Sequence, residues 1–432
     1  MRKDLHNSQN CCTFVAQLYK YVNYRTMKSI REIFRIGYGP SSSHTMGPRK
    51  AAELFLAAYP SAMRYEAHLY GSLSATGKGH LTDAAIVDVI PTVEIVWHDE
   101  FLPFHPNGMR FCAWDAKGEL DAEWTVYSVG GGALEEDSDG IRLLGDKANG
   151  DNAEDIYPLK RLSDIKEYCD KMGWDYWEYV EHFEGKEIWD YLREVWQVMR
   201  EAVERGLDHE GVLPGPLHLR RKAASYYIKV AGYKDNLRTR GLVFSYALAV
   251  SEENASGGKI VTAPTCGSCG VLPAVLYHTW RSRDFSETRI LHALATAGLI
   301  GNVVKENASI SGAEVGCQGE VGVACAMASG AVNQLFRGTL AQIEYAAEMG
   351  LEHHLGMTCD PVCGLVQIPC IERNAFAAAR ALDSNMYAAF SDGTHNVTFD
   401  RVVDVMKQTG HDLPSLYKET SQGGLAAIGQ QD

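Results

Sequence analysis

The spacing of apolar residues changes near residue 160 and divides the chain into two regions. Before that point, short runs rich in β-branched and aromatic residues predict strands at 65–73, 92–98, 109–115 and 123–129. A short helix at 30–36 and a longer one at 49–58 complete this region. We therefore expect an α+β fold that begins with a small α/β domain.

From Ser163 onward the apolar period is that of a helix. Ile188, Leu192 and Val195 fall on one helical face. Later helices are predicted at 242–250, 288–308, 320–336, 339–349, 371–390 and 398–408. The pattern indicates a larger, mostly all-α domain after the α/β domain.

We place the predicted boundaries at 1–26 for an N-terminal extension, 27–185 for the α/β domain with an acidic excursion and a helical linker, and 186–432 for the helical domain. Residues 1–26 lack the continuous apolar core of a secretory signal. The sequence from Met27 is typical of a natural start. Two interpretations of 1–26 therefore stay open, a native extension and a wrongly assigned start.

Composition narrows the class of partner. The formal net charge is −14, and no basic block stands out, which argues against nucleic acids and anionic membranes as partners. No apolar run is long enough to span a bilayer. The 11 cysteines are scattered along a large chain and do not resemble a disulfide framework. We therefore expect reduced thiols and a cytoplasmic location.

A polar loop at 37–48 precedes the helix at 49–58, and Gly-Pro pairs bracket it. Its side chains carry hydroxyls and one imidazole, from Ser41, Ser42, Ser43, His44 and Thr45. These hydroxyls suit a helix cap, and Pro48 suits the first helical turn. The alternative is an anion cradle with His44 beside it, and we favour the cradle.

A second loop, at 71–80, is similar to a phosphate-binding loop but fails in detail. Its glycines are one residue too far apart, and Gly79 replaces the hydroxyl residue that would hold magnesium. We therefore reject nucleotide binding. Lys78 and His80 remain candidates for contact with a substrate carboxylate, and ordinary loop polarity is the alternative.

Cysteines occur in glycine-rich loops of the helical region. Cys317 lies among glycines just before a predicted buried helix, whose N-terminus would stabilise a thiolate. The alternative is a small buried hydrophobe. Cys266 with Cys269 and Cys359 with Cys363 have spacings that also occur in zinc sites and redox dithiols. The flanking residues lack the features of a zinc ribbon, so we disfavour zinc.

Several motifs together resemble one known family, the iron–sulfur L-serine dehydratases. They occur in the family's order at 41–48, 262–265, 309–320, 358–361, 368–374 and 417–421. The similarity extends from about Met27 to about Leu425. The family joins a β domain to a helical α domain, here in one chain. It uses no pyridoxal phosphate, and its members carry a [4Fe–4S] cluster held by three cysteines of the α domain.

Carried over residue by residue, the resemblance implies that Cys317, Cys359 and Cys370 hold the cluster. The iron without a protein ligand would act as a Lewis acid. The implied reaction converts L-serine to pyruvate and ammonia, in serine catabolism and gluconeogenesis. The resemblance further implies an oxygen-sensitive homodimer.

Site roles outside the cluster are less well determined by the motifs. His44 and His80 are our candidates for the base that removes the α-proton, because imidazole has a suitable pKa. The substrate carboxylate would be held by Ser41, Ser42, Ser43, Thr45 and Lys78. These assignments place the site between the two domains.

The sequence departs from the family at two points. Many members end in a cysteine that reaches the fourth iron, whereas this sequence has none after Cys370. Cys363 is either a spare ligand or, as we favour, a residue packed near the cluster. Two other functions stay open: a related cluster-dependent L-cysteine desulfidase, and a non-catalytic serine-binding regulator.

Overall fold

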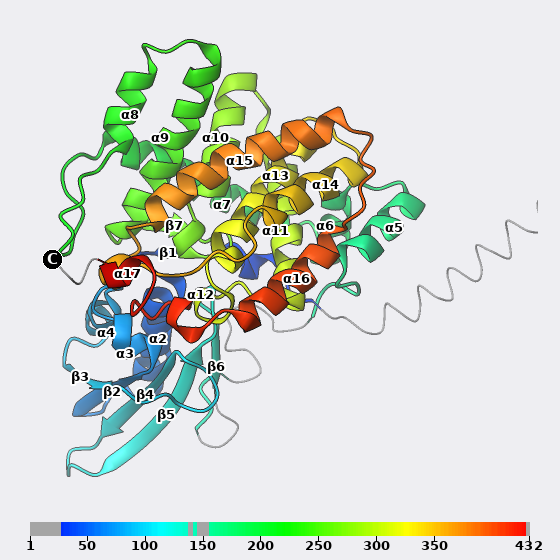
Figure 1. The fold of residues 1–432 in the computed structure, drawn as a ribbon. Helices are drawn as coiled ribbons and strands as arrows, with labels where there is room; N and C mark the ends of the chain where they lie inside the picture. Colours follow the sequence, from blue (N-terminus) through cyan, green and yellow to red (C-terminus); the bar gives the residue numbers. More distant parts are fainter. Residues whose placement is uncertain (1–26, 137–140, 145–154, 429–432) are drawn as a thin grey trace, which may run out of the picture.

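The computed structural model describes residues 27–136, 141–144 and 155–428. A small region built on a β-sheet lies against a larger bundle of helices, which confirms the predicted α+β class (Figure 1). The predicted extension at 1–26, much of the acidic excursion and the tail at 429–432 lie outside the described residues.

The sheet has five strands in the order β3-β2-β4-β5-β6. Their bounds are β2 (Arg64–Tyr70), β3 (Val93–His98), β4 (Gly108–Trp114), β5 (Leu120–Ser128) and β6 (Leu134–Glu136). β2 pairs with β3 in parallel and with β4 antiparallel. Alternate residues of β2 are buried, namely Tyr65, Ala67 and Leu69, because successive side chains point to opposite faces. The predicted strands are confirmed, each with small shifts at its ends.

Helices α2 (Gly47–Ala58) and α4 (Thr82–Val89) belong to the sheet region, and a short helix α3 (Ser72–Thr76) precedes α4. Phe55 of α2 packs against the sheet, with ring centroids 5.5 Å from Phe111 and 6.3 Å from Trp124. These aromatic contacts hold α2 on the sheet, and α2 in turn fixes the polar loop that precedes it.

The helical region forms a second, larger core. Its helices are α5 (Leu162–Met172), α6 (Tyr176–Glu184), α7 (Ile188–Asp208), α8 (Ala223–Val230), α9 (Asp235–Ala255), α10 (Val271–Arg283), α11 (Glu287–Asn307), α12 (Gly312–Val315), α13 (Val323–Leu335), α14 (Leu340–Glu352), α15 (Cys370–Phe390), α16 (Phe399–Asp412) and α17 (Leu425–Ile428). Every residue of α13 is buried, so this helix is the centre of the bundle. Its small residues let neighbouring helices approach closely.

The predicted helix at 30–36 is wrong in its second half. Only Ile30–Glu32 form a helical turn, and Ile36–Tyr38 form strand β1 instead. β1 pairs antiparallel with β7 (Lys259–Val261), more than two hundred residues away. A local apolar pattern does not register such a distant partner. This two-stranded sheet ties the start of the chain to the helical region.

Residues near the start of the described chain belong to the helical core. Met27, Ile30 and Phe34 are fully buried in one cluster with Tyr157 and Leu192. The predicted boundary between residues 185 and 186 stays a prediction, since packing joins segments from both sides of it. Within the described residues, every helix is too short or too polar to cross a membrane.

Candidate active site

The polar loop at 41–48 forms a wide, π-helical turn that runs directly into α2. The turn covers Ser42–Met46, and the Ser41 hydroxyl accepts a hydrogen bond from the backbone N–H of His44 at 3.1 Å. Pro48 lies in the first turn of α2. Ser41 therefore caps this turn, whereas α2 itself begins after Met46 without a side-chain cap. The anion cradle stays a prediction, and the loop is buried as such a cradle requires.

His44 is fully buried, and its neighbours determine its tautomer. The Ser72 hydroxyl donates to the Glu419 carbonyl at 3.3 Å, so it accepts from Nε2–H of His44 at 3.0 Å. Nδ1 then accepts from the Ser43 hydroxyl at 2.9 Å. Burial lowers the pKa of His44 well below its usual value, and the nearby His80 lowers it further. His44 is thus a neutral imidazole.

His80 presents the opposite tautomer. The Thr76 hydroxyl donates to the Ser72 carbonyl at 2.9 Å, so it accepts from Nδ1–H of His80 at 3.1 Å. Nε2 therefore carries the lone pair, and it is buried without a partner among the described residues. Burial lowers the pKa of His80 to about 4. This nitrogen is unprotonated at neutral pH and has a free lone pair, as a general base requires.

Thr45 supports His80 through its hydroxyl group. The Thr45 hydroxyl donates to the backbone carbonyl of His80 at 2.6 Å and accepts from the backbone N–H of Ser41 at 3.1 Å. It thereby joins the two polar loops, and the rings of His44 and His80 lie 4.4 Å apart. The predicted substrate role of Thr45 stays a prediction, and its observed contacts are with the protein.

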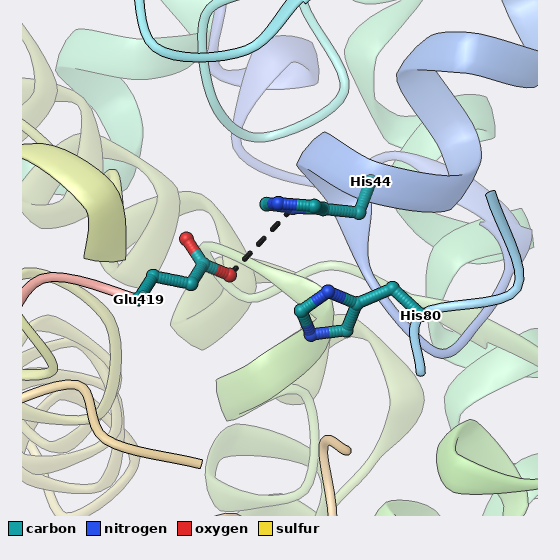
Figure 2. A group of neighbouring side chains, drawn as sticks. All are labelled: His44, His80 and Glu419. Carbon is teal, nitrogen blue, oxygen red and sulfur yellow. Dashed lines mark ion pairs between the residues drawn. The ribbon is translucent and has the colours of Figure 1, made fainter. Parts of the chain in front are cut away.

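Glu419 completes the group, and the sequence reasoning missed it (Figure 2). Its carboxylate oxygen lies 3.7 Å from Nδ1 of His44, and its backbone N–H donates to the carbonyl of Cys359 at 2.8 Å. Burial raises the pKa of Glu419 well above its usual value, and Glu320 raises it further. Donor atoms of His44, His80 and Glu419 lie within 4.8 Å of one another, a set that also suits a divalent metal. The motif at 417–421 contained the only signal for this residue.

The three predicted ligand cysteines come from separate loops. Cys317 caps the turn Gln318–Gly322, which runs into α13 as predicted, and Cys370 is the first residue of α15. Cys359 lies on a loop whose backbone pairs with that of Lys418. Burial raises the pKa of all three thiols, that of Cys317 to about 11, and Glu419, Glu320 and the other two cysteines raise that of Cys359 further. The three thiols are therefore close enough to interact.

Glycines shape the space around these thiols. A Cβ on Gly312 would lie 3.1 Å from Sγ of Cys359, and one on Gly316 would lie 2.6 Å from the Met357 carbonyl oxygen. Arg373 lowers the pKa of the Cys317 thiol against the effect of burial. Three converging thiols, a cationic neighbour and backbone without side chains fit an iron–sulfur cluster held by three cysteines.

Two predicted residues lie away from the buried group. Lys78 is exposed, with its ammonium 5.7 Å from the ring centroid of Trp97. It lines a cavity of about 260 Å³ together with Cys363. Cys363 is exposed, with a left-handed φ of 56°, so its predicted packing near the cluster is wrong. Cys266 and Cys269 are buried, whereas Cys363 is exposed. The two cysteine pairs with spacings found in zinc sites therefore do not all lie in one environment.

Known proteins match this chain over nearly its whole length. The family model of the serine dehydratase alpha chain matches residues 81–426, and that of the serine dehydratase beta chain matches residues 29–90. L-serine dehydratase 1 of Escherichia coli is 40% identical over 94% of this chain and 100% of its own length. L-serine dehydratases of Streptomyces coelicolor and Helicobacter pylori are 40% and 37% identical, each over 92% of this chain and 98% of their own length. The chain belongs to the serine dehydratase family.

Proposed function

We propose that this chain is an L-serine ammonia-lyase, which converts L-serine to pyruvate and ammonia. Relatives named as L-serine dehydratases, about 40% identical over nearly the whole chain, support the reaction. The observation that carries the proposal is the buried contact between the sheet region and the helical region. There Glu419 contacts His44 of the sheet region through its side chain and Cys359 of the helical region through its backbone.

Cys317, Cys359 and Cys370 would hold a [4Fe–4S] cluster as its three protein ligands, which leaves one iron open. When bound, the cluster supplies a Lewis acid that favours departure of the serine hydroxyl group. The thiols must stay reduced to hold it, which supports a cytoplasmic location. We further propose that the protein acts as a homodimer in serine catabolism and gluconeogenesis.

His80 is the base in this proposal. Its unpaired Nε2 removes the α-proton of L-serine, while Thr76 holds the proton on Nδ1. Loss of the α-proton and the β-hydroxyl gives water and aminoacrylate, whose imine tautomer hydrolyses to pyruvate and ammonia. His44 accepts a hydrogen bond from the Ser43 hydroxyl, which leaves the hydroxyls of Ser41 and Ser42 as the proposed donors to the substrate carboxylate.

The test is anaerobic purification followed by iron analysis, a visible spectrum with and without L-serine, and rates on L-serine and L-cysteine. We expect a brown protein with about four irons per chain, a spectral change on adding L-serine, and loss of activity in air. An iron-free preparation with full activity refutes the cluster. Pyruvate formed faster from L-cysteine would favour the desulfidase. A cluster-containing protein that forms no pyruvate would favour the regulator.

A further inference from the structure

The outer face of α15 carries a regular stripe of exposed side chains. They are Phe376, Arg380, Asp383, Tyr387 and Phe390, and the spacing between them alternates between four and three residues. This spacing is the heptad seam with which helices pack against each other. The alanines between these positions, such as Ala377, Ala378 and Ala381, are buried in the body of the protein. α15 therefore has one face in the core and a second packing face turned outward.

Exposure of the aromatic residues on this stripe is unusually high. Phe376 is 70% exposed, Tyr387 58% and Phe390 85%. In Figure 1, α15 runs along the outside of the helical bundle, with α9 and α14 beside it. Isolated exposed aromatics are ordinary, whereas a row of them at seam spacing on one long helix is typical of an interface.

The charged residues in the middle of the stripe indicate which partner packs against this face. Arg380 and Asp383 lie at adjacent seam positions, and both side chains are exposed. Consider a second α15 packed antiparallel, with a twofold axis midway between these two residues. Arg380 then faces Asp383 of the partner subunit, and symmetry repeats the pair. The same register places Phe376 against Tyr387 of the partner subunit.

We propose that two copies of this chain associate through α15, packed antiparallel about that twofold axis. The inference rests on the proposed homodimer and is independent of the proposed chemistry. The centre of the seam is self-complementary, because Phe376 faces Tyr387 of the partner subunit and Arg380 faces Asp383 of the partner subunit. Neighbouring helices extend the face: Leu237 of α9 is 59% exposed, which helps to approach the roughly 1,600 Å² of a standard interface.

The interface also has a consequence for the proposed cluster. α15 begins at Cys370, so a partner packed along this helix restrains the element that carries one ligand. Asp383 already pairs with Arg240 of its own chain at 2.5 Å, but both side chains are more than half exposed. The carboxylate therefore retains room for a second guanidinium group from the partner.

Charge reversal tests the pairing on the full-length, anaerobically purified protein. In Arg380→Glu homodimers, Glu would face Asp383 of the partner subunit twice. In Asp383→Arg homodimers, Arg would face Arg380 of the partner subunit twice. We expect each variant to raise the dimer Kd about 100-fold, measured by analytical ultracentrifugation. An equal mixture of the two variants restores every opposite-charge pair, so it should form heterodimers.

Arg401→Glu, an exposed change on α16 outside the seam, is the matched control and should leave the Kd unchanged. Circular dichroism and iron content verify that each variant is folded. Single variants with the wild-type Kd overturn the α15 interface, and so does a mixture that stays monomeric. A monomeric wild-type protein overturns the homodimer as well, while pyruvate formation tests the lyase activity separately.

Discussion

At the scale of single residues, hydrogen-bond direction distinguishes the two histidines. Both are buried and neutral, yet Ser72 fixes a proton on Nε2 of His44, and Thr76 fixes one on Nδ1 of His80. Of these two histidines, only His80 has a ring nitrogen without a partner among the described residues. Residue type alone made His44 and His80 equal candidates for the base. The neighbouring hydroxyl groups distinguish them, because they fix a different tautomer on each ring.

Replacing His80 by Gln removes the proposed base. We expect kcat to fall about 100- to 10,000-fold with iron content unchanged, because a general base contributes that much and His80 is not a proposed ligand. Exchange of the α-proton of L-serine with deuterated water should be lost in parallel. His44→Gln is the comparison, and a larger loss of kcat there than in His80→Gln would reverse our assignment of the base.

Cys370→Ala removes a proposed ligand, and Cys363→Ala is its matched control in the same loop region. We expect the first variant to lose bound iron and its visible absorption, and the second to keep both, because Cys363 is exposed. Iron content of the anaerobically purified proteins is the measurement. Loss of iron in Cys363→Ala together with retention in Cys370→Ala would contradict the ligand assignment.

At the scale of elements, glycine-dependent loops hold the ends of the helices that carry cysteines. Cys317 precedes α13 and Cys370 begins α15, so both thiols lie where helical N–H groups are free. The loop before Cys317 turns at Gly316, where φ is 76°. A side chain at this turn would meet backbone, which leaves little room for relaxation.

Gly316→Ala adds a Cβ 2.6 Å from the Met357 carbonyl oxygen as well as left-handed strain. We expect a loss of stability of about 3 kcal/mol and a lowered iron content. Gly118→Ala is the control, since its φ of 79° is similar and no atom lies within 4 Å of the new Cβ. It should destabilise by about 1 kcal/mol and keep its iron. Equal iron content in both variants would show that the Cys317 loop tolerates the displacement.

At the scale of the whole molecule, the two regions bury the site between them. Ser72 of the sheet region donates to the carbonyl of Glu419, and Asn254 of α9 donates to the carbonyl of Pro40 at 2.8 Å. Burial at this junction lowers the pKa of both histidines. The electrostatic character of the site is therefore a property of the assembled molecule.

The pH dependence of the rate should show this burial. A base acts only when it is unprotonated, and the pKa of His80 is lowered to about 4. We therefore expect kcat/KM to hold as pH falls through 6.5 and to decline only below about pH 5. Visible spectra at each pH control for loss of the cluster. A decline centred near pH 6.5 would show that an exposed, ordinary histidine limits the rate.

Burial of histidines should also make the stability of the folded protein depend on pH. Burial also lowers the pKa of His278 and His354 to about 4. Between pH 6.5 and 4 these two histidines are protonated in the unfolded chain but not in the folded protein. The unfolded state therefore binds more protons, and the stability of the folded state falls as pH decreases. We expect a lowered thermal midpoint over this range, and His354→Gln should decline less steeply. A wild-type midpoint independent of pH in this window contradicts the effect.

Much of the architecture follows from local patterns. Alternation of apolar residues predicted the strands, and helical periodicity predicted the bundle. Both patterns can be recognised because each is contained within a short stretch of sequence. The predicted helix at 30–36 failed where Ile36 pairs with Val261, a partner that no local pattern contains. The predicted packing of Cys363 was wrong for a related reason, since the exposure of its side chain depends on how its loop is folded.

The sequence by itself determined the family, the two regions and the cysteine motifs, since these depend on residue identity and order. Only the tertiary structure added Glu419 to the two histidines, assigned their tautomers and turned one face of α15 outward. Those features depend on which hydroxyl, carboxylate or solvent each group meets. Ser72 and Glu419 reach His44 from segments distant in sequence, and even Thr76, four residues from His80, meets its ring only in the folded loop.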